Sequence, residues 1–315
     1  MSEHTSWIAD AHVDVLYRME REGCDFYGPS PLQASAERLM SAGIATQVFA
    51  LFVSPSLPSQ YQLEIVLRQI DLFYERVVRD AVLRPVRDLA DLHGARREGV
   101  MAGLLSLEGG GCLRGQPEML RTLHRLGVRG IGLTWNDANE LCDGCREPRG
   151  GGLTAHGLAV VREAHRLGMW VDLSHLSDRG IADLFDRTSG PLMASHANCR
   201  SIHPHPRNLT DDVIRELFRR EGWMGLVFEG SFVGKPADVT VDQLLLHLDH
   251  VLQLGGEDYV GFGSDFDGTS HPMPGLSDAG DYRRFADLIR KRYGSALAEK
   301  ILFQNFESFL QRTLS

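Results

Sequence analysis

The sequence predicts an α/β protein with a (β/α)8 barrel of the TIM type, and two observations carry that prediction. The first is a repeated order along the chain: an amphipathic segment, then a glycine, then a short apolar run. The second is that these runs are apolar nearly throughout, as in parallel strands that helices cover. An open doubly wound sheet is the rival, but it would need a glycine-rich phosphate turn, and none follows the run at residues 9–14.

The apolar runs number about eight, which is the number of strands that closes a barrel of this type. We expect each run to form one barrel strand. In chain order they are Ile8–Asp14, Ile44–Val53, Val100–Glu108, Val128–Asn136, Met169–His175, Pro191–His196, Trp223–Glu229 and Tyr259–Asp265.

The segments between these runs carry apolar residues at three- and four-residue spacing, which predicts helices. Thr210 and Thr240 each precede acidic residues and fit helix N-caps. Gly127, Gly168 and Gly222 fit the left-handed position that ends a helix. We expect residues 1–315 to form one domain, with C-terminal helices that close the barrel or pack across its outside. Examples of the predicted helices are Gln62–Val78, Met119–Leu126, Leu158–Leu167, Val213–Arg220, Leu244–Leu254, Tyr282–Tyr293 and Leu297–Leu314.

Composition and charge exclude several classes of protein. The chain has 33 Lys and Arg against 42 Asp and Glu, a net charge of −9, which argues against a nucleic-acid partner. No run is long and apolar enough for a membrane span, and the first ten residues lack a signal-peptide pattern, so we expect a cytoplasmic protein with no membrane partner. Cys142 and Cys145 form a C-x-x-C pair that could be redox-active or bind metal, although two loop thiols are the simpler interpretation.

Potential metal ligands stand at the C-terminal ends of the predicted strands. In a barrel these ends meet at one mouth, so ligands that are distant in sequence become neighbours. His12 and Asp14 are two residues apart on one strand and therefore point to the same face. The other strand-end candidates are Glu108, His175, His196 and Asp265.

These residue types indicate hydrolytic chemistry with two metal ions. Glu108 precedes three glycines and could bridge two cations, the alternative being a salt bridge at the barrel rim. His175 and His196 each follow a serine at equivalent strand ends and suit a second ion. Two divalent ions can hold a bridging water and lower its pKa to about 7. Zinc suits such ligands best, Asp265 is a candidate proton shuttle, and Arg207 could bind a substrate carboxylate.

Taken in order, the motifs resemble the membrane (renal) dipeptidase family of zinc peptidases across nearly the whole chain. The match is specific because so many motifs occur in register. They are Asp10-Ala-His12-Val-Asp14, Leu107-Glu108-Gly109-Gly110, Leu133-Thr134-Trp135-Asn136, Val171-Asp172-Leu173-Ser174-His175, Ser195-His196, Arg207-Asn208-Leu209-Thr210-Asp211-Asp212 and Gly263-Ser264-Asp265-Phe266-Asp267-Gly268.

The resemblance implies a metal-dependent hydrolase barrel with two Zn²⁺ ions per chain that cleaves dipeptides and tolerates a D-residue at the C-terminal position. It implies that His12 and Asp14 hold one ion and that His175 and His196 hold the other. Glu108 would bridge the ions, Asp265 would transfer the proton, and Arg207, Trp135 and Asn136 would contact the substrate. It also implies a homodimer.

One departure concerns Trp135, which stands where mammalian members carry a substrate-contacting histidine. Tryptophan donates one hydrogen bond and cannot become a cation, so the substrate range is open. The preferred side chains depend on the loops Asp137–Gly152 and Glu229–Asp238. Two other functions stay open: a two-metal barrel hydrolase acting on a cyclic amide, lactone or phosphoester, and a barrel retained as a binding or structural protein.

Overall fold

The computed structural model describes residues 7–236 and 239–314. The start of the N-terminal segment and the end of the loop Glu229–Asp238 lie outside these residues. None of the helices in the described ranges is long and apolar enough to cross a membrane.

Eight parallel strands close into a barrel, which confirms the predicted fold class. The ring runs β1-β2-β4-β5-β6-β7-β8-β9 and returns to β1, since β1 pairs with both β2 and β9 and β2 pairs with β4. This closure excludes the open sheet. A short strand that the sequence did not predict, β3 (Leu83–Pro85), pairs with the start of β4. The ring strands are β1 (Ile8–Val13), β2 (Ile44–Phe52), β4 (Met101–Glu108), β5 (Val128–Gly132), β6 (Trp170–Asp172), β7 (Leu192–Ala194), β8 (Trp223–Leu226) and β9 (Val260–Phe262).

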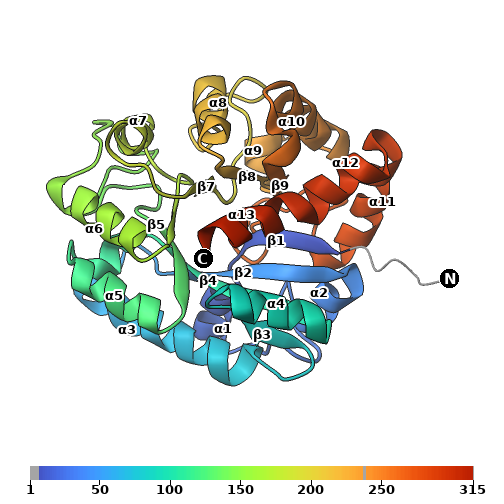
Figure 1. Ribbon diagram of the computed structural model, residues 1–315, viewed down its shortest axis with the longest axis horizontal. Coiled ribbons are helices and arrows are strands. Elements are labelled where there is room, and N and C mark those ends of the chain that lie inside the picture. Colours follow the sequence, from blue (N-terminus) through green and yellow to red (C-terminus); the bar gives the residue numbers. More distant parts are fainter. Residues whose placement is uncertain (1–6, 237–238, 315) are drawn as a thin grey trace.

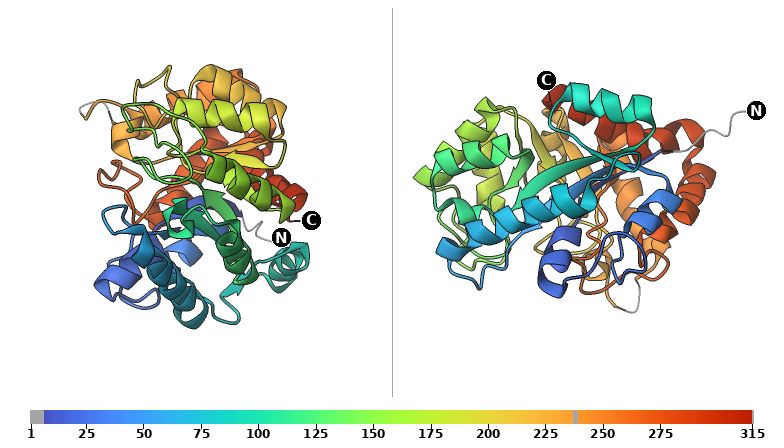
Figure 2. Two further views of the ribbon diagram at one scale, coloured as in Figure 1. Left: turned by 90° about the vertical axis from the view of Figure 1, so that its left-hand side faces the viewer. Right: turned by 90° about the horizontal axis from the view of Figure 1, so that it is seen from below.

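Helices surround the barrel on its outer face (Figures 1 and 2). A π-helical turn extends α3 to Val77, and another joins α12 to α13. The helices are α1 (Val15–Glu22), α2 (Ala36–Ala42), α3 (Ser59–Leu72), α4 (Leu89–Glu98), α5 (Pro117–Arg125), α6 (Ala155–Arg166), α7 (Asp178–Arg187), α8 (Asp211–Arg219), α9 (Gly230–Val233), α10 (Val241–Gln253), α11 (Tyr282–Tyr293), α12 (Ser295–Glu299) and α13 (Asn305–Thr313).

The predicted helix ends are correct except at one glycine. Thr210 and Thr240 accept hydrogen bonds from backbone N–H groups three residues on, as N-caps do. Gly127 and Gly168 have positive φ angles of 104° and 71°. Gly222 does not, and the left-handed residue is Glu221 at φ 57°. Glycine is needed at 222 because a Cβ there would lie 2.7 Å from the Leu192 carbonyl oxygen.

The C-terminal helix α13 closes the N-terminal end of the barrel, where Figure 1 shows it crossing near the start of β1. Its Phe306 ring lies 4.5 Å from Trp223, and its Phe309 ring lies 6.3 Å from Trp170. All four aromatic side chains are buried, and both tryptophans begin a barrel strand. Water and ligands therefore reach the barrel interior from the opposite end.

Candidate metal centre

The strand-end side chains meet at the C-terminal mouth of the barrel. His12 lies in β1 and Asp14 directly follows that strand, while Glu108 is the last residue of β4. His175 and His196 come three and two residues after β6 and β7. All of these side chains are buried although they are polar or charged.

The first group of potential ligands consists of His12, Asp14 and Glu108. The His12 Nε2 atom lies 3.5 Å from Asp14 Oδ2 and 3.4 Å from Glu108 Oε2. His12 Nε2 and Asp14 Oδ1 are buried with no hydrogen-bond partner among the described residues. A buried polar atom without a partner is costly, and a cation between these atoms would satisfy them.

The second group consists of His175, His196 and the same Glu108. Glu108 Oε1 lies 2.9 Å from His175 Nε2 and 3.7 Å from His196 Nε2. Within each group, the ligand atoms all lie within 4.8 Å of one another. The two oxygens of Glu108 therefore face two different sets of ligands.

Hydrogen bonds at the far side of each ring fix the tautomers of the second group. His175 Nδ1 lies 2.9 Å from the amide oxygen of Asn136, which can only accept, so this nitrogen carries the proton. His196 Nδ1 lies 2.6 Å from the Ser195 hydroxyl, whose own proton goes to Asp172, so His196 Nδ1 also donates. Both Nε2 atoms are then left with a lone pair.

These two Nε2 atoms are only 3.0 Å apart. Burial, and after it Arg207, lowers the pKa of His175 to about 3, so its ring is neutral. Two lone pairs at this distance repel each other unless a positive charge lies near both. The donor set of imidazole nitrogens and carboxylate oxygens fits a divalent transition metal such as zinc.

The protein compensates the carboxylates of the mouth unequally. Burial raises the pKa of Glu108, but His12 and His175 outweigh burial and hold that pKa low. Burial and the adjacent Glu108 raise the pKa of Asp14 to about 6, and burial and Asp14 raise the pKa of Asp265 well above its ordinary value. Burial lowers the pKa of His12, but Glu108 and Asp14 outweigh burial and hold that pKa high. Bound cations would supply the missing positive charge.

A carboxylate and a serine support each side of the mouth in the same way. Asp172 accepts hydrogen bonds from the backbone N–H groups of Ser174 and Ser195 and from the Ser195 hydroxyl. Asp10 accepts from the N–H groups of His12 and Ser264 and from the Ser264 hydroxyl.

The two supports differ in what the serine touches next. The Ser195 hydroxyl also contacts the imidazole of His196, whereas the Ser264 hydroxyl contacts the backbone carbonyl of His12 and no imidazole of the described residues. Only the first support therefore orients a potential ligand through its side chain.

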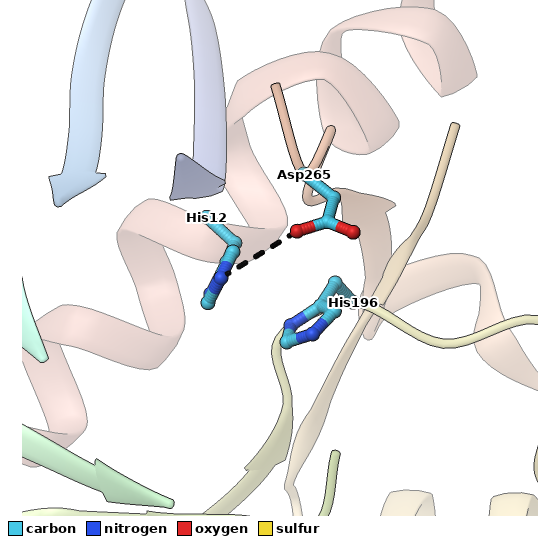
Figure 3. Close-up of side chains that lie close together, drawn as sticks. All are labelled: His12, His196 and Asp265. Carbon is cyan, nitrogen blue, oxygen red and sulfur yellow. Dashed lines mark ion pairs between the residues drawn. The ribbon is translucent and has the colours of Figure 1, made fainter. Parts of the chain in front are cut away.

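Asp265 converges on the same point as His12 and His196 from the loop after β9 (Figure 3). Its Oδ1 atom lies 3.8 Å from His12 Nε2. Asp265 and His175 each come three residues after a strand, and both have a left-handed backbone, at φ 65° and 70°. This conformation is unfavourable for residues other than glycine and concentrates at functional sites.

The ligand groups open into a cavity of about 340 Å³, a size suited to a small ligand. Trp135 lines it together with Tyr17 and Phe52, and the Trp135 ring lies 5.7 Å from Phe52 and 5.9 Å from His175. Asn136 also lines it, but its amide oxygen is held by His175. These side chains form an aromatic wall beside the metal ligands.

Arg207 lies behind this cavity. It is buried, its Nη2 donates to the His196 carbonyl oxygen at 3.2 Å, and its guanidinium lies 5.3 Å from the centre of the Phe232 ring, which lines the cavity. Its Nε atom has no hydrogen-bond partner among the described residues. The unpartnered donor fits an acceptor brought by a ligand.

The C-x-x-C pair does not form a disulfide, since Cys142 and Cys145 are both free thiols. Several site residues were not predicted from the sequence: the supports Asp10, Asp172, Ser195 and Ser264, and the cavity residues Tyr17, Phe52, Arg146, Glu229 and Phe232. Ser195 and Ser264 left a signal because they directly precede His196 and Asp265. The loop residues Arg146, Glu229 and Phe232 lie in the two loops from which the sequence predicted the side-chain preference, but nothing distinguished them individually.

A parallel eight-stranded barrel with clustered imidazoles and carboxylates at the C-terminal ends of its strands defines a class, the metal-dependent barrel hydrolases. Comparison with known proteins identifies the family within that class. The sequence model of the family described as Membrane dipeptidase (Peptidase family M19) matches residues 3–313, and the chain belongs to this family. The predicted resemblance is confirmed.

Individual relatives agree with this assignment. The chain is 34% identical over 300 residues to dipeptidase aclJ of Aspergillus oryzae, covering 90% of this chain and 69% of that protein. The crystal structure of dipeptidase AC is 28% identical with a TM-score of 0.90, covering 99% of both chains. A metallopeptidase of Rhodobacter sphaeroides, solved with a phosphinate mimic of the dipeptide L-Ala-D-Ala, is 27% identical with a TM-score of 0.89, covering 97% of this chain and 99% of that one.

Proposed function

We propose that this chain is a two-zinc dipeptidase that accepts a D-residue at the C-terminal position of its substrate and works as one domain. The observation that carries the proposal is the position of Glu108, whose two oxygens face two separate sets of ligands. A carboxylate placed in this way suits two neighbouring cations.

The contacts support a role for each ligand. His12 and Asp14 would hold one ion, His175 and His196 the other, and Glu108 both. When bound, the ions would lower the pKa of a water molecule and polarise the scissile carbonyl. The hydrogen bonds that their Nδ1–H groups donate to Asn136 and Ser195 keep the two distal imidazoles in the tautomer that leaves Nε2 free for a metal.

The other site residues would act on the substrate directly. Asp265 faces the ligand groups, where its carboxyl oxygens can hold a proton and pass it to the leaving amine. The unpartnered donor of Arg207 would bind the C-terminal carboxylate of the dipeptide. Trp135 and its aromatic neighbours would exclude water from one side of the scissile bond. The dipeptide mimic bound to the Rhodobacter sphaeroides relative supports a substrate of this size and chirality.

The test combines metal content with turnover. We expect a zinc-loaded preparation to contain two ions per chain and to hydrolyse L-Xaa-D-Xaa dipeptides. Full metal loading without hydrolysis of any dipeptide would overturn the proposal. Arg207→Ala should raise the KM for dipeptides sharply, and an unchanged KM would favour a two-metal hydrolase acting on another class of bond.

A further inference from the structure

The charged side chains that line the cavity differ in whether the protein already satisfies them. Glu229 accepts hydrogen bonds from six donors. They belong to Ser231, Thr269, Ser270 and His271, so both of its oxygens are fully used. Glu229 therefore fastens one wall of the cavity and is not free to bind a substrate amine.

Asp267 is satisfied in the same manner. Its oxygens accept from the backbone N–H groups of Gln33 at 2.8 Å and Ala34 at 3.0 Å, and from the Arg18 guanidinium at 3.2 Å. His271 forms a hydrogen bond through its Nδ1 to Glu229. Apart from the metal-facing groups, these side chains leave no charge for a ligand to neutralise.

Arg146 is the exception. It lines the cavity with its side chain exposed, and no carboxylate of the described residues lies within ion-pair distance of it. Its backbone is nevertheless fixed to the site. Its N–H donates to the Asn136 carbonyl at 2.9 Å, and the preceding residue, Cys145, donates to the carbonyl of His175 at 2.7 Å.

Arg146 and Arg207 both stand beside the pair of imidazoles: the residue before Arg146 donates its N–H to the His175 carbonyl, and Arg207 donates to the His196 carbonyl. Burial, and after it Arg146 and Arg207, lowers the pKa of His205 to about 4, so both guanidinium groups act on that ring. His205 stacks 4.5 Å from Phe232, which lines the cavity. Among the described residues, Arg146 is thus the one guanidinium that lines the cavity, and Arg207 adds a second next to Phe232.

We propose that Arg146 forms a subsite for an anionic side chain on the C-terminal residue of the dipeptide, so that aspartyl or glutamyl residues are preferred there. The inference rests on the proposed function, in which Arg207 binds the main-chain carboxylate. The guanidinium of Arg146 is then left to bind a second anionic group of the substrate. Guanidinium and carboxylate form paired, charge-assisted hydrogen bonds that a neutral amide cannot match.

The experiment compares isosteric substrates. With the zinc-loaded full chain, we expect kcat/KM for L-Ala-Asp to exceed that for L-Ala-Asn by about tenfold, measured for both chiralities of the second residue. Arg146→Gln should bring this ratio to about one, Arg146→Lys should keep part of it, and Arg146→Glu should invert it.

Arg149→Gln is the matched control. It removes the same charge from the same loop, but Arg149 binds Asp143 and does not line the cavity, so the ratio should stay at its wild-type value. Hydrolysis of L-Ala-D-Ala with an equal Asp-to-Asn ratio in the wild type and Arg146→Gln would overturn the subsite and leave the proposed function standing. If no dipeptide is cleaved, the proposed function fails and the subsite with it.

Discussion

At the carboxyl ends of its strands the barrel buries charged and polar groups, among them Glu108, His175 and His196. At the amino ends it buries Trp170 and Trp223 against the phenylalanines of helix α13. The first region contains buried polar atoms without a hydrogen-bond partner among the described residues and two imidazole Nε2 atoms that face each other, whereas the second consists of close aromatic contacts.

The difference separates two ways in which buried groups act. Burying charge costs free energy that only a ligand can recover, so the mouth is prepared for binding at the expense of stability. Burying aromatic surface stabilises the fold directly. Substitutions at the two ends should therefore change different properties, and the outer surface should change neither strongly.

The largest effect is expected at the mouth from Glu108→Gln. The amide keeps the shape of the side chain but removes the charge shared by both ligand groups. We expect kcat/KM to fall by at least about a thousandfold, with loss of bound zinc.

Metal analysis and steady-state kinetics check this prediction, with Glu37→Gln on the exposed surface as the control. A variant that keeps both bound ions would contradict the shared role given to Glu108.

At the opposite end, Phe309→Ala should mainly change stability. The substitution removes a buried ring that contacts Trp170 and should lower the free energy of unfolding by about 3–5 kcal/mol. Activity per folded molecule should stay unchanged. Urea unfolding measures the loss, and Leu246→Ala, at a side chain 46% exposed on α10, should cost far less. An equal loss in activity would mean that the two ends are coupled.

Within the mouth, the two carboxylate–serine supports should differ in their effect on zinc affinity. Ser195→Ala frees the His196 ring to turn, so we expect zinc affinity to fall by about 10- to 100-fold. Ser264→Ala removes a matching bond to Asp10 but none to a ring, and zinc affinity should change little. Competition with a chelating dye measures both, and equal losses would contradict the role given to Ser195.

The smallest effect is expected on the outer surface, at Glu163 of α6. Its carboxylate pairs with Arg166 at 2.6 Å and Arg121 at 3.1 Å, and Arg166 above all lowers its pKa to about 2. Because the folded pKa lies below the unfolded value of about 4.3, the stabilisation is present at neutral pH and declines as the pH falls from about 4.3 towards 2.

Glu163→Gln should therefore cost less than about 1 kcal/mol at pH 7 and less still at pH 3.5. Unfolding measured at both pH values checks the sign. A cost that grows in acid would show that the carboxylate is not stabilised by its arginines.

The barrel strands could be predicted because each strand is apolar along its length and several end in a potential ligand. Helix α1 was missed because it begins directly after Asp14, with no turn residue between strand and helix. Strand β3 was missed because three residues, one of them proline, show no periodicity. Hydrophobic periodicity thus finds long elements and overlooks short or abutting ones.

The ligand candidates were predictable for a similar reason, since the fold brings every strand end to one place. The contact from Ser195 to Asp172 was not, because it joins neighbouring strands whose register the sequence does not reveal. Arg146 stands in an irregular loop, and the sequence does not show that it lacks a carboxylate partner while the hydrogen-bonding capacity of Glu229 and Asp267 is filled by other residues. Such roles depend on contacts between residues that are distant in the sequence, and only the three-dimensional structure shows those contacts.

The aromatic side chains with which α13 closes the N-terminal end of the barrel also determine how substrate and product exchange. Because Phe306 and Phe309 close the N-terminal end of the barrel, substrate enters and product leaves the site through the same opening at the C-terminal mouth. Each released amino acid must leave past the next incoming molecule, so accumulated product competes with fresh substrate for the passage and slows turnover late in a reaction.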